Sequence, residues 1–328
     1  MKRITALLLA IALLALPLGG CGSPAPTSTP DPEPTASNPT ESETPTPGPV
    51  TFTDDLGNEV SVDNPQRVIA TLSSFAQTWQ LAGGQNLVGL TEDAQTEGKV
   101  EIPADVQYVG TYDTLNLEQI IALEPDLVIL SAAPRYKQTD LQEALKGAGI
   151  NFAYFNVTHF EDYLRMLKVF TDITARPDLY DVNGEAVQER VNAILAQVPV
   201  ASGEKPTVFF LITESRGTRV QNGETMPGRI LTELGAENLA DTNPSLLSEF
   251  SLEGLIAAEP DYIFVLPMGN SAEATAANVA TLEGNPAWGD IKAVKDGKYF
   301  KVDLEHFMYK PNNLWDESYQ ILFDDLYK

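Results

Sequence analysis

The sequence predicts an α/β protein with two Rossmann-like α/β lobes joined by a single long α-helix. Apolar strand-like runs alternate with helical patterns, one ten-residue segment occurs twice, and an amphipathic helical stretch separates the two copies. Alternation of strands and helices favours parallel sheets that are covered on both faces. The length of 328 residues also fits two lobes better than one.

The N-terminus predicts export and lipid anchoring. A basic start precedes an apolar run over residues 4–18, which is shorter than the ~20 residues needed to span a bilayer. The Leu-Gly-Gly-Cys that closes this run resembles a lipobox, and Cys21 is the only cysteine, so no intrachain disulfide can form. We expect a signal peptide over residues 1–20 and an extracytoplasmic protein held on the cell membrane by diacylated Cys21. A short membrane anchor with an incidental cysteine is the alternative.

The segment after the cysteine predicts a solvated tether over residues 21–50. Of the 29 residues from 22 to 50, 19 are Pro, Thr or Ser. Such a composition cannot bury enough surface to offset the entropy of ordering, and an extended chain of this length reaches up to about 90 Å. The net charge of −25 disfavours nucleic acid and anionic lipid surfaces as partners.

We expect the first lobe over residues 51–158, beginning near Thr51. Ser74 is the expected N-cap of its first helix, which carries two aromatic residues and ends at a Gly-Gly pair. The strands are expected at residues 67–71, 87–90, 126–130 and 151–155, and further helices at residues 118–123 and 137–146.

A helical segment over residues 159–200 is expected to connect this lobe to the second, over residues 201–328. A helix from about Pro177 to Val198 would be ~33 Å long at 1.5 Å per residue and would act as a strut. Its apolar face is formed by Val187, Val191, Ile194, Leu195 and Val198. In the second lobe we expect strands at residues 207–212, 261–265 and 299–302, and helices at residues 229–234 and 312–326.

An internal repeat supports two homologous lobes. The segment from Leu117 to Asp126 matches that from Leu252 to Asp261 at seven of ten positions, and both copies run from a helix into a strand. A common helix–proline–strand pattern is the simpler explanation, but it does not account for Glu118 and Glu253 recurring on the helix side.

These features together resemble a known family. The lipobox, the tether, the repeat, and the segments 53–57, 65–69 and 288–298 are similar to those of substrate-binding lipoproteins of ABC importers for ferric siderophores, haem or cobalamin. The resemblance implies the class III periplasmic-binding-protein fold, a monomer that is not an enzyme, and a ligand between the lobes. It also implies that Glu118 and Glu253 pair with arginines of a permease dimer, which works with its ATPase. Ordinary first-turn glutamates, favoured by the helix dipole, are the alternative.

Ligands of open α/β sheets bind beyond the carboxyl ends of the strands, which nominates loop residues. The candidates are Phe75, Trp79, Tyr112, Arg135 and Tyr136 in the first lobe and Arg216, Arg219, Met226, Met268 and Tyr309 in the second. Aromatic rings suit the organic shell of a chelate, and arginines pair with carboxylate or catecholate oxygens. Phe75 and Trp79 could instead be core residues, and Arg216 and Arg219 solvated loop charges. Met226 stands where related siderophore binders can carry a second arginine, which weakens the case for a highly anionic chelate.

The sequence gives no indication of a metal or catalytic centre. The two histidines, His159 and His306, cannot form a zinc or manganese site alone, and a lone His306 is more typical of a structural residue than of a haem ligand. No nucleophile elbow, dinucleotide fingerprint or phosphate loop is present. We therefore expect a receptor for a ferric siderophore, with no cofactor, and a crevice beside Arg135 and Tyr309. A cobalamin or haem receptor, an extracellular α/β enzyme and an adhesin are the alternatives.

Overall fold

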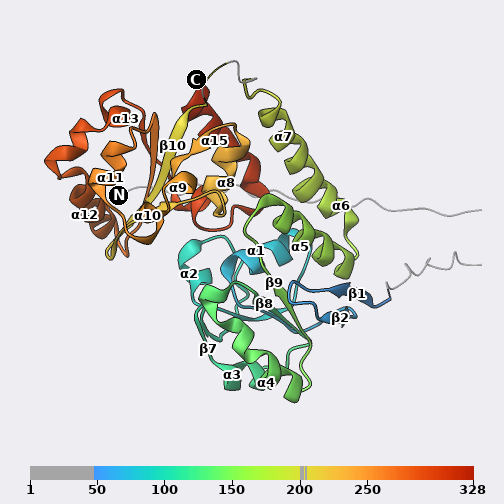
Figure 1. Cartoon of the computed structure of the whole chain (residues 1–328). Helices are drawn as coiled ribbons and strands as arrows, with labels where there is room; N and C mark the ends of the chain where they lie inside the picture. Colours follow the sequence, from blue (N-terminus) through green and yellow to red (C-terminus); the bar gives the residue numbers. More distant parts are fainter. Residues whose placement is uncertain (1–47, 200–202, 204) are drawn as a thin grey trace, which may run out of the picture. The chain divides into compact units, whose positions relative to one another are not determined.

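Figure 1 shows the computed structural model, which describes residues 48–199, 203 and 205–328. The predicted signal peptide, Cys21 and most of the tether lie outside the described residues. Contacts divide the chain into Met1–Pro45 and Thr46–Lys328, and all that follows concerns the second unit. Among the described residues, none of the helices combines the length and the apolar character needed to cross a bilayer.

The first lobe is built around a parallel five-stranded sheet in the order β5-β4-β3-β8-β9. Its strands are β3 (Val68–Ala70), β4 (Leu87–Leu90), β5 (Gln107–Tyr108), β8 (Leu127–Ser131) and β9 (Phe152–Phe155). Its helices are α1 (Ser73–Leu81), α2 (Asp93–Glu97), α3 (Leu117–Ala122) and α4 (Gln142–Gly147), with 3-10 turns η1 (Pro134–Tyr136) and η2 (Gln138–Leu141). Two antiparallel hairpins, β1 (Val50–Thr53) with β2 (Glu59–Val62) and β6 (Gly110–Thr111) with β7 (Thr114–Leu115), complete it.

The second lobe has a mixed sheet in the order β11-β10-β13-β14, with β12 also paired to β10. Only β11 runs antiparallel to its neighbour. The strands are β10 (Thr207–Glu214), β11 (Gly217–Gln221), β12 (Glu237–Asn238), β13 (Tyr262–Pro267) and β14 (Tyr299–Lys301). The helices are α8 (Met226–Glu233), α9 (Leu239–Thr242), α10 (Pro244–Ser248), α11 (Leu252–Ala257), α12 (Ala272–Glu283), η4 (Pro286–Asp290), α13 (Lys292–Lys295), α14 (Leu304–Phe307), η5 (Asn312–Leu314) and α15 (Trp315–Tyr327).

The central strands are apolar because each sheet is covered on both faces. In β10, Phe210 belongs to the large core that also holds residues of α5, α7 and α15, whereas its neighbours Phe209 and Leu211 belong to a separate core on the other face. Ile69 of β3 likewise faces a different core from Val68. This alternation is the physical reason why the continuous apolar runs predicted buried strands correctly.

Helices connect the two sheets. The segment comprises α5 (Phe160–Ile173), α6 (Pro177–Tyr180), a π-helical turn η3 (Asp181–Glu185) and α7 (Ala186–Leu195). From Pro177 to Leu195 the helix is continuous, about 28 Å long at 1.5 Å per residue, and in Figure 1 α7 runs beside α15. The ion pair between Arg190 and Asp316 joins these two helices. The predicted strut is therefore present, although it ends at Leu195 rather than at Val198.

The two copies of the repeat fold alike. Glu124 and Glu259 each precede a proline, and both glutamates have a positive φ, of 44° and 46°. The carboxylate of Asp126 accepts a hydrogen bond from the backbone N–H of Arg67 at 2.9 Å, and that of Asp261 accepts one from Thr207 at 3.0 Å. The repeated Pro-Asp thus connects the end of a helix to the start of the neighbouring strand in each lobe, as expected for homologous lobes.

Two predicted elements differ from the structure. The first helix begins at Ser73, with Leu72 rather than Ser74 as N-cap, because Asp93 of another element accepts the hydrogen bond from the Ser73 N–H at 2.7 Å. The helix expected over residues 137–146 is α-helical only from Gln142: Lys137 has a left-handed φ of 54°, and residues 138–141 form the 3-10 turn η2. The predicted lobe boundaries remain a proposal, since residues 200–202 lie outside the described part.

Candidate functional site

The carboxyl ends of the strands of both lobes border one large cleft. It has two chambers, a main chamber of about 1050 Å³ and a side chamber of about 380 Å³. Six residues line both chambers: Leu72, Arg135, Tyr136, Arg219, Met308 and Lys310. The crevice expected beside Arg135 and Tyr309 is therefore present, and the strand-end rule located it.

In the first lobe, an arginine and two tyrosines form a connected group in this cleft. The guanidinium carbon of Arg135 lies 4.5 Å from the centre of the Tyr136 ring, and Arg135 also donates a hydrogen bond to the Tyr136 hydroxyl. The rings of Tyr136 and Tyr112 meet edge to face with centroids 5.5 Å apart. Burial raises the pKa of Tyr136, so this hydroxyl stays neutral. The group offers flat apolar surface together with one cation.

Gln138 fixes the position of these loops. Its side chain is buried and its Nε2 donates to the carbonyl of Tyr112 at 2.7 Å. Its Oε1 accepts hydrogen bonds from the Thr71 hydroxyl and the Ser131 N–H, both at 2.7 Å. Three loops that follow different strands are thereby joined by one amide, which restricts movement of the wall that carries Arg135.

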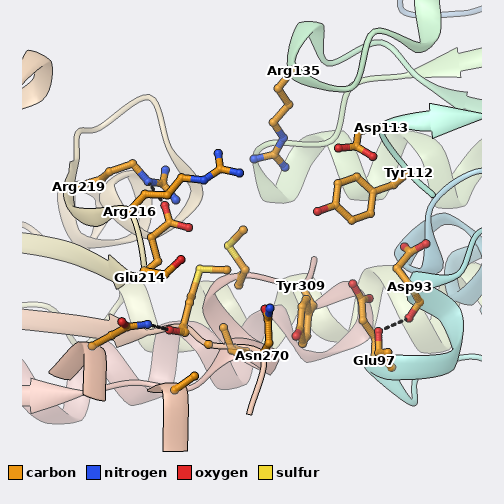
Figure 2. A pocket seen from close by; sticks show the side chains of 18 of the residues that line it. Asp93, Glu97, Tyr112, Asp113, Arg135, Glu214, Arg216, Arg219, Asn270 and Tyr309 are labelled. Atoms are coloured by element: carbon orange, nitrogen blue, oxygen red, sulfur yellow. Dashed lines mark hydrogen bonds and ion pairs between the residues drawn. The ribbon is translucent and has the colours of Figure 1, made fainter. Parts of the chain in front are cut away.

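In the second lobe, the hairpin of β10 and β11 contributes two arginines, Arg216 in its tight turn and Arg219 in β11. Arg219 pairs with Glu214 at 2.8 Å, so its charge is compensated within the protein. Arg216 forms no ion pair with any described residue. Figure 2 shows Arg216 reaching into the cleft from this turn, on the side opposite to Arg135. The turn therefore supplies one uncompensated cation.

The loop after α14 contributes Tyr309 and Lys310. It is anchored by Asn312, which is fully buried and donates to the Ser74 carbonyl at 2.9 Å and to Gln77 Oε1 at 2.6 Å. Asn312 has a φ of 53°, a left-handed conformation that asparagine tolerates better than most residues. The loop thus belongs to the second lobe by sequence but is held against α1 of the first.

The far wall of the main chamber is acidic. Asp93 and Glu97 line it, and Figure 2 shows them away from the arginines, with Glu97 close to Tyr309. Asp113 also lines the chamber, but Figure 2 shows it beside Tyr112, on the side of Arg135. Burial, and secondarily the charge of Asp93, raises the pKa of Glu97 to about 7. Asp93 and Glu97 are therefore separated in space from the arginines, whereas Glu214 is paired with Arg219.

The structure places nine of the ten predicted ligand-contacting residues at the cleft. The main chamber is lined by Tyr112, Arg135, Tyr136, Arg216, Arg219, Met268 and Tyr309, and the side chamber includes Phe75 and Met226. Trp79 lines neither chamber: it is only 2% exposed, and its ring packs against Phe170 with centroids 5.4 Å apart. We correct Trp79 to a core residue, because its ring is buried against Phe170 and its indole N–H donates to the Gln85 carbonyl at 2.9 Å.

The sequence analysis missed Lys310, Glu97, Asp93 and Gln138. Lys310 directly follows Tyr309, and Glu97 lies just beyond β4, so the same strand-end rule could have nominated both. The predicted candidates comprised only aromatic, arginine and methionine side chains. Gln138 gives no signal in the sequence, because its role depends on contacts with residues up to 67 positions away.

Neither histidine lines the cleft. The ring nitrogens of His306 lie 2.9 Å from Asp303 and 3.3 Å from Glu317, and His159 precedes α5. Within the described residues, no group of three or more His, Cys, Asp or Glu side chains is arranged to hold a metal ion.

Glu118 and Glu253 are exposed and occupy equivalent positions in the two lobes. Each lies in the first turn of its helix, α3 or α11, whose N-cap side chain, Asn116 or Ser251, accepts a hydrogen bond from the helix backbone. Neither carboxylate takes part in an ion pair with a described residue. Both are available to a partner.

Comparison with known proteins agrees with this geometry. Residues 68–304 match the model of a family described as periplasmic binding protein. The chain is 24% identical over 259 residues to the "Uncharacterized ABC transporter substrate-binding lipoprotein YvrC" of Bacillus subtilis, covering 78% of each chain. It is 26% identical over 258 residues to the "Fe(3+)-citrate-binding protein YfmC" of the same organism, covering 77% of this chain and 78% of that one.

A solved structure shares the fold. The siderophore binding protein BauB, bound to ferric iron and two molecules of acinetobactin, superposes with a TM-score of 0.68 at 19% identity, covering 85% of this chain and 97% of that one. The likeness in fold extends over both lobes.

Proposed function

Since the chain belongs to the periplasmic binding protein family, we propose that it is the extracytoplasmic binding protein of an ABC importer for a metal chelate. In this proposal it captures a ferric siderophore or a related iron complex between its lobes and delivers it to a permease. Binding rather than catalysis agrees with the relatives, which are named as substrate-binding or citrate-binding proteins.

The observation that carries this proposal is the cleft at the strand ends of both lobes. Its main chamber of about 1050 Å³ lies at the upper end of the ~300–1,000 Å³ found for small-molecule sites, so it suits a bulky ligand. Tyr112, Tyr136 and Tyr309 present aromatic surface for an organic shell, and Arg135 and Arg216 present cations for negatively charged oxygens.

An iron chelate is favoured over haem by the position of the histidines. Haem iron is commonly held by a histidine or another axial ligand, and neither His159 nor His306 lines the cleft. A chelate whose own oxygens surround the iron needs no protein ligand. Cobalamin, whose metal is likewise enclosed by its organic ring, remains the alternative within the same class.

The proposed delivery step uses the two equivalent glutamates. Glu118 and Glu253 would pair with cationic residues on the two halves of a permease dimer, one from each lobe, and so orient the protein on it. Lipidated Cys21 and the tether over residues 21–50 would keep the protein at the membrane surface while allowing it to reach the permease.

Native mass spectrometry tests the proposed ligand class. The full-length protein would be incubated separately with ferric citrate, ferrioxamine B, haemin and cyanocobalamin. With at least one of the iron chelates, we expect the protein mass to increase by the mass of one complex. This complex should stay bound at a low collision energy that already removes adventitious ligands. If cyanocobalamin or haemin alone binds, the ligand is the alternative one, and if none binds the proposed function is wrong.

A further inference from the structure

Lys310 lies where the two chambers of the cleft meet. It lines both chambers, together with Arg135 and Arg219. Its loop is anchored two residues later by Asn312, whose side chain donates to the Ser74 carbonyl at 2.9 Å. The amine of Lys310 is thus supplied by the second lobe and held in place by the first, in the interior of the cleft.

The charge of Lys310 is uncompensated within the described part of the chain. It forms no ion pair there, whereas the neighbouring Arg219 is paired with Glu214. Two charged groups act on Lys310: Arg135 opposes its protonation, and Asp162 favours it. Asp162 is already engaged, because its carboxylate accepts hydrogen bonds from the backbone of Thr158 and His159.

An unpaired cation in such a place costs free energy that a bound anion would recover. Taking an ammonium group out of water is unfavourable unless a charged or hydrogen-bonding partner replaces the water. Consistently, burial lowers the pKa of Lys310 to about 8. A negatively charged oxygen of a ligand, placed between Lys310 and Arg135, would supply the missing partner for both cations.

The remaining walls restrict the shape of the ligand. The acidic residues Asp93 and Glu97 on the far wall of the main chamber would repel a chelate that is negative on all sides. The side chamber, which Lys310 also lines, includes polar residues such as Gln221 and Glu224 and a set of apolar side chains: Phe75, Val157, Ile212, Met226 and Phe307. The ligand must therefore carry its negative charge on one side, next to an apolar portion.

We propose that Lys310 is a ligand-contacting residue, and that the ligand is an organic metal complex with carboxylate oxygens on the side that faces Lys310. The inference rests on the proposed function. It adds that the contact with Lys310 determines which metal complexes the protein binds. An apolar arm beside the charged oxygens would enter the side chamber.

Three variants of the full-length protein separate this role from a structural one. Lys310→Met removes the charge but keeps the length of the side chain, and Lys310→Arg keeps the charge. Lys137→Met is the matched control, because Lys137 is an exposed cation on the loop beside Arg135 and Tyr136 that lines neither chamber. Since Lys310→Met removes an unpaired cation, its thermal unfolding midpoint should equal or exceed that of the wild type.

Calorimetric titration of each variant with four complexes provides the test. Ferric citrate and haemin carry carboxylates, whereas ferrioxamine B and cyanocobalamin carry none. We expect the wild type to bind a carboxylate-bearing complex, Lys310→Met to bind it roughly 10- to 100-fold more weakly, and Lys310→Arg and Lys137→Met to stay within about threefold. Which of the two carboxylate complexes binds shows whether the oxygens belong to a small chelate or to a porphyrin.

The pH dependence gives a second readout. A bound anion favours protonated Lys310, so wild-type affinity should fall as the pH rises through about 8, and affinity of Lys310→Arg should not. The other charged or titratable groups that act on Lys310 or line the side chamber with it are Arg135, Tyr136, Arg219, Asp162 and Glu224. Glu97, whose pKa is about 7, and Tyr309 also line the main chamber with Lys310, and Lys310→Arg keeps both unchanged. If the wild type binds only ferrioxamine B or cyanocobalamin, or if Lys310→Met leaves affinity unchanged, the inference is overturned while the proposed function stands. Binding of none of the four overturns both.

Discussion

The side-chain amide of Asn312 donates a hydrogen bond to the backbone carbonyl of Ser74, across 2.9 Å and 238 positions of sequence. Ser74 lies in the first turn of α1 in the first lobe, whereas Asn312 begins the last helical segment of the second. This contact fixes the loop with Tyr309 and Lys310 at the base of the cleft. It is the reason why two residues of the C-terminal lobe can form a site with Arg135.

We predict that Asn312→Ala destabilises the protein by about 2–3 kcal/mol. It removes two buried hydrogen bonds, worth roughly 1 kcal/mol each, and forces alanine into a left-handed conformation. Urea unfolding measures the change. Asn86→Ala is the control, because Asn86 also has a positive φ, of 64°, but is exposed. Equal losses in both variants would show that only the backbone conformation matters.

We predict that Gly84→Ala destabilises the first lobe by about 1–3 kcal/mol through overpacking. A Cβ atom at Gly84 would lie 2.2 Å from Cε2 of Trp79, whose indole is fixed by a 2.9 Å hydrogen bond to the Gln85 carbonyl. Thermal unfolding measures the effect. Gly147→Ala, where nothing lies within 4 Å of the added atom, should leave the midpoint nearly unchanged. An unchanged midpoint for Gly84→Ala would contradict the packing described for Trp79.

Glu97 makes stability depend on pH. Its pKa is raised from 4.5 to about 7, so the folded state binds this proton more tightly than the unfolded state does. The stabilisation is therefore complete below pH 4.5 and is lost as the pH rises through 7. Between pH 5 and pH 8, the free energy of unfolding of the wild type should fall by about 2 kcal/mol more than that of Glu97→Gln. This value is reduced for solvent screening, because the Glu97 side chain is partly exposed. If urea unfolding gave parallel pH profiles for the wild type and Glu97→Gln, the pKa of Glu97 would be the same in the folded and unfolded states, contrary to this prediction.

The docking role predicts a specific separation of uptake from binding. Glu118→Gln combined with Glu253→Gln should lower ligand uptake by cells roughly tenfold or more while leaving the affinity for ligand unchanged. The repeat offers a matched control in Glu124→Gln combined with Glu259→Gln, since these glutamates are also exposed and equivalent in the two lobes. A loss of ligand affinity in the first double variant would refute the assignment.

The fold could be predicted largely because its signals are local or repeated. Continuous apolar runs located β4, β8, β9 and β13 to within one or two residues, since both faces of each sheet are buried. The repeat located equivalent helices in the two lobes. The antiparallel strand β11 was missed, because its sequence, Gly-Thr-Arg-Val-Gln, is polar at one edge of the sheet and carries no apolar run.

The candidate site could be predicted only in part. The rule that ligands bind at strand ends nominated the correct loops, but it cannot tell which side chains on a loop face the cleft. Trp79 and Phe75 show this limit, since both lie on α1 and only Phe75 borders a chamber. The anchoring of Lys310 through Asn312 depends on a contact between distant lobes, which periodicity and spacing do not encode.

The central claim is that a metal complex binds between the two lobes. A crystal structure of the protein with a bound ferric complex tests this most directly, because anomalous diffraction at the iron absorption edge locates the metal independently of the surrounding atoms. We predict a single strong peak inside the cleft, between Arg135 and Tyr309, with the complex in contact with both lobes. A peak on the outer surface, or a complex that touches one lobe only, would contradict the account.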